Sequence, residues 1–269
     1  MRVPFAFLLA AATTLVISLC DRGHAQDALA KPQRLLLLYQ KPDGHPPTTH
    51  EYLQGLTRLQ TLLRETPKLD VRLVPADEPW TDGPELLDGA DGCVLFLSEG
   101  AKWVSADPAR LAALQRFAER RGGLVCLHWG MGTKSAEPIA AYVKLFGGCH
   151  GGPDRKYKVA EMELRQTSSP HPITRGVTAV TVNEEFYYAL KWADPKPTPL
   201  MEAVIEGEAY AVSWAWNRPD GGRSFGFSGL HFHANWDRPE YRRLVTQGVL
   251  WTLGREIPAE GIAIGEREN

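Results

Sequence analysis

Short apolar runs and amphipathic segments alternate through the first half of the chain. Mostly apolar runs predict buried strands at 34–39, 69–74, 92–97 and 124–127. Apolar residues spaced three or four positions apart predict helices at 52–63, 107–121 and 135–146. Buried strands that alternate with helices are typical of a doubly wound α/β fold, with a mostly parallel sheet and helices on both faces.

The second half of the chain has a different pattern. Apolar and polar residues alternate at 157–165, which indicates a strand with one solvent-facing side. Further strands are expected at 179–182, 200–206, 209–216 and 223–230, before an amphipathic helix at 239–253. We expect these strands to extend the sheet as antiparallel edge strands. Residues 85–90 are expected to form a short connection, and residues 147–153 a flexible glycine-rich loop.

Composition limits the possible functions. The 269 residues carry a formal net charge of -2, and 43% of them are hydrophobic. This length and hydrophobic content suit one large domain. The near balance of charge gives no reason to expect binding to nucleic acid or to an anionic membrane. A small, neutral or weakly charged substrate is the better expectation.

The N-terminus has the order of a secretory signal. Met1-Arg2 precedes an apolar segment at 3–19, and small residues follow, with cleavage expected after Ala25 or after Ala30. The mature protein is then expected to be exported to the periplasm or the exterior, without a membrane segment. We divide the chain into a signal peptide at 1–25, a linker at 26–33, a single domain at 34–257 and a C-terminal tail at 258–269.

Three cysteines lie beyond the predicted signal peptide, namely Cys93, Cys126 and Cys149. Export permits disulfides, but Cys93 and Cys126 fall inside apolar strands, which favours buried free thiols. A bridge between these two residues is left open, because their strands could be neighbours.

The strand at 124–127 ends at a histidine. Gly122-Gly123 precedes the strand, and His128-Trp129 follows it. Open parallel sheets bind ligands at the carboxyl edge, where this histidine is expected to lie. Imidazole exchanges protons near neutral pH and also binds metals, so His128 is the first catalytic candidate. The Trp129 ring is a candidate floor for a sugar ring. A purely structural role is the alternative for both residues.

Several motifs together resemble the trehalose-utilisation (ThuA-like) family, which has the class I glutamine amidotransferase-like, flavodoxin-like fold. The similarity covers about residues 34–254. The motifs are Gly122-Gly123 with His128, Phe146-Gly147-Gly148 with His150, His171 to Gly176 with Glu185 and Tyr187 downstream, and Gly222 to Phe225 with His231. The resemblance implies a sugar substrate, in particular a 3-keto-glucoside made by a partner oxidoreductase of the same pathway.

The resemblance also selects candidate residues. Two adjacent acids of a strand point to opposite sides, and the family pattern selects Glu185 over Glu184 as the one that faces the pocket. The predicted catalytic residues are His128, Glu185 and His231. The predicted substrate-binding residues are His45, Trp129, His150 and Tyr187.

Other chemistries are less well supported. Amidotransferases of this fold have a nucleophilic cysteine where this chain has His128, so ordinary amidotransferase chemistry is not expected. The sequence has no His-Glu-x-x-His or Cys-x-x-Cys metal motif, no Gly-x-Ser-x-Gly elbow and no dinucleotide-binding glycine motif, so no nucleotide cofactor is expected. Two metal arrangements are left open. One is a single divalent metal held by His128, His150, His231 and Glu185, and the other is a His231–His233 pair on one strand face.

Two functions remain. The first is an exported enzyme that acts on a sugar or keto-sugar by histidine and carboxylate acid–base chemistry, as an isomerase, lyase or hydrolase, with or without the metal. The alternative is a non-catalytic carbohydrate-binding module on the same fold.

Overall fold

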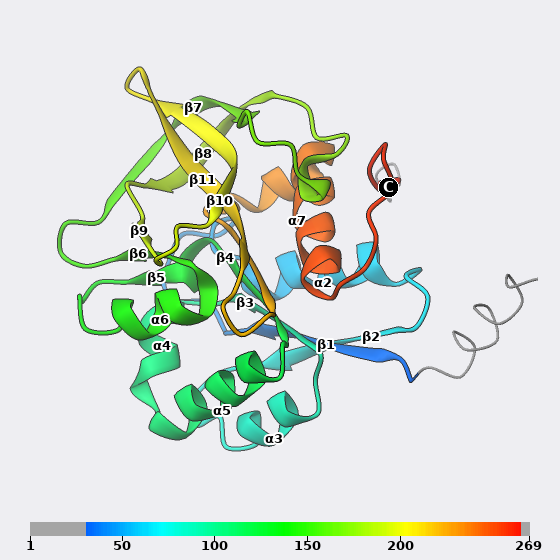
Figure 1. Cartoon of the computed structure of the whole chain (residues 1–269). Coiled ribbons are helices and arrows are strands. Elements are labelled where there is room, and N and C mark those ends of the chain that lie inside the picture. The colour runs from blue at the N-terminus through cyan, green and yellow to red at the C-terminus, as the bar shows by residue number, and fades with distance from the viewer. Residues whose placement is uncertain (1–30, 265–269) are drawn as a thin grey trace, which may run out of the picture. The chain divides into compact units, whose positions relative to one another are not determined.

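The computed structural model describes residues 31–264. The predicted signal peptide at 1–25, most of the linker and the last five residues of the tail therefore lie outside the described part. From Gln33 onward, the described residues form one compact unit (Figure 1). Among the described residues, no helix is both long and apolar enough to cross a membrane.

Within residues 31–264, nine strands form one sheet in the order β2-β1-β3-β4-β12-β11-β10-β7-β8. The first five are parallel: β1 (Gln33–Tyr39), β2 (Leu69–Pro75), β3 (Gly92–Phe96), β4 (Gly123–Leu127) and β12 (Arg223–Phe227). The other four are antiparallel: β7 (Lys156–Gln166), β8 (Val180–Tyr188), β10 (Thr198–Ile205) and β11 (Glu208–Asn217). The predicted α/β fold is confirmed. Four of the five strands expected from the second half of the chain extend the sheet in antiparallel pairs, whereas the strand expected at 223–230 is β12, which pairs in parallel with β4 inside the sheet.

Helices cover both faces of the parallel strands (Figure 1). One face packs against α2 (Tyr52–Leu63) and α7 (Pro239–Thr252). The other face packs against α3 (Gly83–Asp88), α4 (Gly100–Ala106), α5 (Pro108–Glu119) and α6 (Ile139–Phe146). In β1, Leu35 and Leu37 enter the first core, whereas Leu36 and Leu38 enter the second. Because side chains alternate along a strand, a strand buried on both faces is apolar throughout.

Several local predictions are wrong. The expected connection at 85–90 is largely part of α3, and the unpredicted helix α4 follows β3. The expected flexible loop contains β6 (Gly148–Gly151), which pairs with β5 (Gly132–Thr133) and β9 (Lys191–Trp192). These pairings join distant segments, so the local pattern does not reveal them.

Three predicted boundaries also change. The strand expected at 179–182 is β8, which continues to Tyr188. Helix α6 begins at Ile139 rather than at 135, because the preceding residues are exposed and Pro138 stands at its N-terminus. The strand expected at 223–230 ends at Phe227, and Leu230 has left-handed backbone with φ 84°.

Cys93, Cys126 and Cys149 are buried free thiols. Cys93 lies opposite Leu124, and Cys126 lies opposite Leu95. The two cysteines therefore lie two residues out of register on neighbouring parallel strands. With a rise of about 3.3 Å per residue and about 4.8 Å between strands, their Cα atoms are about 8 Å apart. A disulfide requires Cα atoms about 4.4–6.8 Å apart, which explains why the bridge left open by the sequence does not form.

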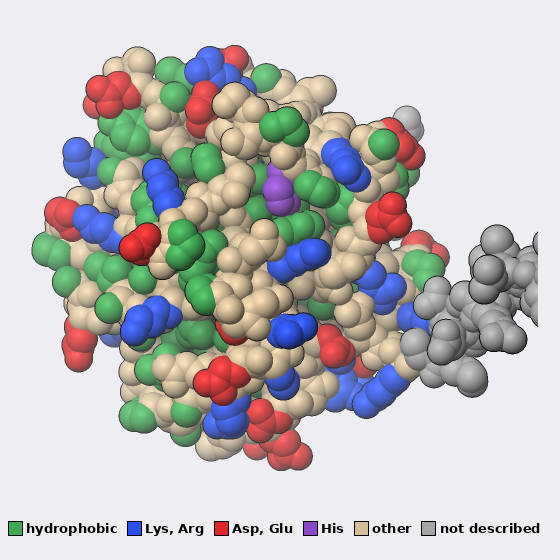
Figure 2. Space-filling view, in the orientation of Figure 1, with side chains coloured by type: hydrophobic (Ala, Val, Ile, Leu, Met, Phe, Trp, Pro, Cys, Tyr) green, Lys and Arg blue, Asp and Glu red, His purple; other side chains and the backbone are tan. Residues whose placement is uncertain are grey.

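Figure 2 shows basic and acidic side chains interspersed over the face in view. A mixture of signs does not create the extended positive field that attracts nucleic acid to a protein. The expectation that the protein has no nucleic-acid partner stays a prediction.

Candidate functional site

His128 begins a sharp turn at the carboxyl end of β4. It has φ 45°, in the left-handed region that residues other than glycine rarely adopt, and it opens the 3-10 helix η1 (His128–Met131). The turn lies close against α4, since a Cβ atom added at Gly100 would lie 1.9 Å from the Gly130 carbonyl oxygen. Strained backbone that is held by its surroundings is frequent at functional sites.

Pairing between β4 and β12 orients the His128 ring. Leu127 lies opposite Phe227, so the next residues, His128 and Ser228, come side by side. His128 Nδ1 lies 2.7 Å from the Ser228 carbonyl oxygen. Because a carbonyl only accepts, Nδ1 carries the proton and Nε2 presents a lone pair. This fully buried ring is therefore held in one tautomer.

A second histidine, His50, comes from the proline-rich loop after β1. Its Nε2 lies 3.1 Å from His128 Nε2, and its Nδ1 lies 3.0 Å from Asp43 Oδ2. The Tyr52 hydroxyl donates to the same carboxylate oxygen at 2.7 Å. Sequence reasoning missed His50 and Asp43 as site residues, because a loop without periodicity does not reveal which of its side chains are buried.

His231 completes a group of three imidazoles, His50, His128 and His231, which we call the histidine cluster. His231 Nδ1 lies 3.0 Å from His50 Nε2 and 3.3 Å from His128 Nε2. The Glu184 carboxylate fixes the backbone here by accepting hydrogen bonds from Leu230 N at 2.8 Å and from His231 N at 3.1 Å. Three distant segments thus meet at the carboxyl edge of the parallel strands.

The two adjacent glutamates of β8 have different environments. Glu184 is fully buried and supports the backbone that carries His231. Glu185 Oε2 lies 3.9 Å from His231 Nδ1. Glu185 is therefore the glutamate that faces the histidine cluster.

Aromatic rings form one wall of the site. The Tyr187 hydroxyl lies 3.0 Å from His128 Nε2, and its ring stacks on His150 with centroids 3.9 Å apart. The Trp129 ring stands edge-on to Tyr187 at 5.7 Å. All three of these wall residues are buried, so the sequence-predicted residues Trp129, His150 and Tyr187 lie together beside His128.

His45 lies at the exposed end of the site. Its ring stacks on His50 with centroids 3.6 Å apart, and its Nδ1 lies 2.7 Å from Asp43 Oδ1. A cavity of about 170 Å³ is lined by the loop at 42–51, including both histidines. All seven residues selected from the sequence therefore lie in or beside this site, together with the unpredicted His50 and Asp43.

Comparison with known proteins identifies the family. A family model described as "ThuA: Trehalose utilisation" matches residues 36–252. The chain belongs to the ThuA family. A crystal structure of a ThuA-like protein from Bacteroides uniformis superposes with a TM-score of 0.61 at 13% identity, covering 84% of this chain and 94% of that chain. At this identity the likeness concerns the fold alone.

A second solved structure is similar to this ThuA-family chain. It is the glutaminase domain of CTPS from Trypanosoma brucei with bound acivicin, with a TM-score of 0.49 and 10% identity, covering 86% of this chain and 98% of that chain. No curated protein matches the sequence.

Burial keeps the imidazoles of this ThuA-family site neutral. Burial, followed by the interaction with His50 and His231, lowers the pKa of His128 well below its usual value. Burial likewise lowers the pKa of His231 to about 4 and that of His150 to about 3. It also lowers the pKa of His50, against the opposing effect of Asp43. At neutral pH these rings therefore present lone pairs rather than positive charge.

The pKa values of the three carboxylates of the site shift in different directions. Burial raises the pKa of Glu184 to about 7, with backbone N–H groups and Asn235 acting in opposition. Burial also raises the pKa of Glu185. Burial tends to raise the pKa of Asp43 as well, but hydrogen bonds from His50, Tyr52 and His45 hold it well below its usual range. Asp43 is thus a fixed anion beside His50.

Two further histidines of the ThuA-family chain lie elsewhere. The His231–His233 pair on one strand face, which the sequence left open, does not occur, because β12 ends at Phe227 and His233 opens the 3-10 helix η3 (His233–Asp237). His171 precedes the 3-10 helix η2 (Pro172–Thr174), where its Nδ1 accepts a hydrogen bond from Ile173 N at 3.2 Å. His171 therefore has a local structural role.

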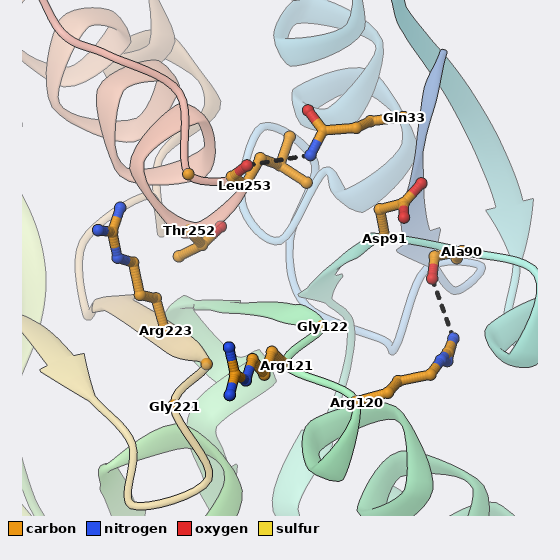
Figure 3. Close-up of a pocket in the computed structure, with 12 residues that line it drawn as sticks. Gln33, Ala90, Asp91, Arg120, Arg121, Gly122, Gly221, Arg223, Thr252 and Leu253 are labelled. Atoms are coloured by element: carbon orange, nitrogen blue, oxygen red, sulfur yellow. Dashed lines mark hydrogen bonds between the residues drawn. The ribbon is translucent and has the colours of Figure 1, made fainter. Parts of the chain in front are cut away.

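A cavity of about 360 Å³ lies at the opposite, amino edge of the parallel strands (Figure 3). Residues at strand starts line it, Gln33 of β1 among them. Arg120 donates to the Ala90 carbonyl and Arg223 to the Trp251 carbonyl, both at 2.9 Å. These arginines hold neighbouring backbone together. Ligands of parallel sheets bind at the carboxyl edge, which favours the histidine cluster as the candidate site.

Proposed function

We propose that the protein is an exported ThuA-family enzyme that acts on a sugar or a 3-keto-glucoside by proton transfer. One observation carries the proposal. His128, Glu185 and His231 are far apart in the chain, yet His231 Nδ1 lies 3.3 Å from His128 Nε2 and 3.9 Å from Glu185 Oε2. The family description, trehalose utilisation, supports a glucoside as the substrate. Export is part of the proposal and rests on the signal-like sequence at 1–25.

The proposed chemistry uses a carbon next to a ketone. The Glu185 carboxylate takes a proton from this carbon, and the electron pair moves to the keto oxygen, to which Tyr187 donates a hydrogen bond. Return of the proton completes an isomerisation. In an elimination, the glycosidic oxygen instead leaves the adjoining carbon and receives the proton that Glu185 took. Subsequent addition of water to the double bond so formed gives net hydrolysis.

The remaining contacts of the site suit a sugar. Trp129, which stands edge-on to Tyr187, offers its ring to the apolar C–H surface of a pyranose. His150 and His45 offer ring nitrogens to its hydroxyl groups. A substrate with a keto group also requires a partner oxidoreductase that forms the ketone from the parent glucoside.

Incubation of the purified protein with 3-keto-glucosides, followed by NMR of the products, tests the proposal. We expect turnover by the wild type and a loss of about 10²-fold or more in the His128→Ala and Glu185→Gln variants. Glu185 takes the proton, and His128 Nε2 positions the Tyr187 hydroxyl at 3.0 Å. Glu163→Gln is the matched control, since this exposed glutamate of β7 lies outside the site. Undiminished turnover by both site variants would refute the mechanism. Saturable binding without product would indicate the carbohydrate-binding module instead.

A further inference from the structure

We infer that the histidine cluster binds one divalent first-row transition-metal ion, with zinc as the reference ion. The three protein ligands are His50 Nε2, His128 Nε2 and His231 Nδ1. The inference deepens the proposed function, on which it rests only for the reaction that the ion would serve. The donor set differs from the one left open by the sequence, because His50 takes part and His150 does not.

The first argument concerns protons. His50 Nδ1 faces the Asp43 carboxylate, and His128 Nδ1 faces the Ser228 carbonyl. Both acceptors require the proton on Nδ1, which leaves Nε2 of each ring without one. These two Nε2 atoms nevertheless lie 3.1 Å apart. Two lone pairs facing each other at this distance repel, and a cation bound between them removes the repulsion.

The second argument concerns distances. The three nitrogens form a triangle with sides of 3.0, 3.1 and 3.3 Å. Zinc binds imidazole nitrogen at about 2.0–2.1 Å in tetrahedral geometry, which places ligand nitrogens about 3.3–3.4 Å apart. The triangle is thus within a few tenths of an ångström of the required size. An ion at this bond length would stand about 1 Å from the plane of the three nitrogens.

The third argument concerns the supporting residues. Metal-binding histidines commonly donate their other N–H group to a carboxylate or a backbone carbonyl, which fixes the ring and its tautomer. Asp43 provides this support for His50, and Ser228 provides it for His128. The Asp43 side chain is itself held by the Tyr52 hydroxyl at 2.7 Å. The rings are therefore preorganised for an ion.

The fourth argument concerns the kind of ion. Neutral imidazole nitrogens suit zinc and its first-row neighbours, whereas magnesium and calcium prefer oxygen ligands. Three histidines with a remaining open position are typical of catalytic rather than structural zinc sites. Two other groups lie beside the triangle. Glu185 Oε2 is 3.9 Å from His231 Nδ1, and the Tyr187 hydroxyl is 3.0 Å from His128 Nε2. Groups suited to proton transfer thus adjoin the proposed ion.

The test uses the purified full chain, stripped with a chelator and titrated with Zn²⁺ or Co²⁺. We expect one bound ion per chain by elemental analysis, and visible Co²⁺ absorption of the tetrahedral type. The His50→Ala and His231→Ala variants should bind at least about 100-fold more weakly, the upper end of what loss of a supporting residue costs. His233→Ala is the matched control and should bind like the wild type, because His233 lies outside the cluster.

Two results would overturn the inference. One is a stripped wild type that takes up no more ion than the His50→Ala/His231→Ala double variant. The other is unchanged affinity in folded His231→Ala. If circular dichroism shows that a variant does not fold, the number of ions bound per wild-type chain still tests the inference.

The proposed function can fail separately from the metal site. An ion bound at one per chain without product from keto-glucosides refutes the proposed function alone. Full turnover by metal-free protein that also takes up no added Zn²⁺ or Co²⁺ refutes the metal site alone.

Discussion

Gly100→Ala tests whether close packing at the start of α4 holds the His128 turn in place. The added methyl carbon would lie 1.9 Å from the Gly130 carbonyl oxygen. Carbon and carbonyl oxygen ordinarily approach to about 3.3 Å, so the backbone must move apart by about 1.4 Å. The Gly130 oxygen is not free to move, since it accepts a 2.6 Å hydrogen bond from the buried Tyr142 hydroxyl.

The expected loss of stability follows from these contacts. Overpacking costs about 1–3 kcal/mol, and breaking the buried Tyr142 hydrogen bond costs about 1–3 kcal/mol. Alanine is the better helix former by about 1 kcal/mol or less, which offsets part of the loss. We therefore expect the free energy of unfolding to fall by about 3 kcal/mol. Because His128 lies two residues before Gly130, metal affinity should fall with it.

Urea unfolding followed by circular dichroism measures this change, with an expected decrease in the midpoint of about 1 M or more. Gly207→Ala is the control, since Gly207 has φ 87° and nothing within 4 Å of an added Cβ. Its substitution carries only the cost of left-handed backbone, about 1–2 kcal/mol. If Gly100→Ala unfolds at the wild-type midpoint, the packing argument for the His128 turn is wrong.

Three further predictions concern the surroundings of the histidine cluster. Asp43→Asn should weaken metal binding by about 10- to 100-fold in a competition titration, because it removes the anion that orients His50. Glu184→Gln should lower the free energy of unfolding by about 1–3 kcal/mol in urea, because an amide nitrogen would face N–H donors that the carboxylate now satisfies. The thiols of Cys93, Cys126 and Cys149 are buried. Burial raises the pKa of all three thiols, that of Cys149 to about 12, so a thiol reagent should label the protein only as it unfolds.

Each of these predictions has a contradicting result. Wild-type metal affinity in Asp43→Asn would show that the carboxylate does not orient the ligand. Glu163→Gln on the exposed side of β7 is the control for Glu184→Gln, and equal stability of the two variants would contradict the proposed support of His231. Rapid labelling of a thiol in the folded protein would reopen thiol chemistry at this fold.

The sequence by itself determined the helices and strands in which buried residues recur at a regular spacing. The run of leucines in β1 predicted a strand covered on both faces, because alternate side chains enter opposite cores. Helix α2 followed from apolar spacing, and His128 followed from its place after an apolar strand. Helix α4 was missed, since seven residues give too short a pattern to distinguish a helix from a connection.

The tertiary structure alone decided the composition of the histidine cluster. His50 lies in a loop whose residues have no repeating burial, and its contact with His231 joins positions 181 residues apart. The local pattern likewise gave no reason to expect Glu184, rather than Glu185, to support the His231 backbone. Hydrophobic periodicity reports which side of an element is buried. It carries no information on which loops meet at a sheet edge, because that depends on strand order and on packing between segments distant in the chain.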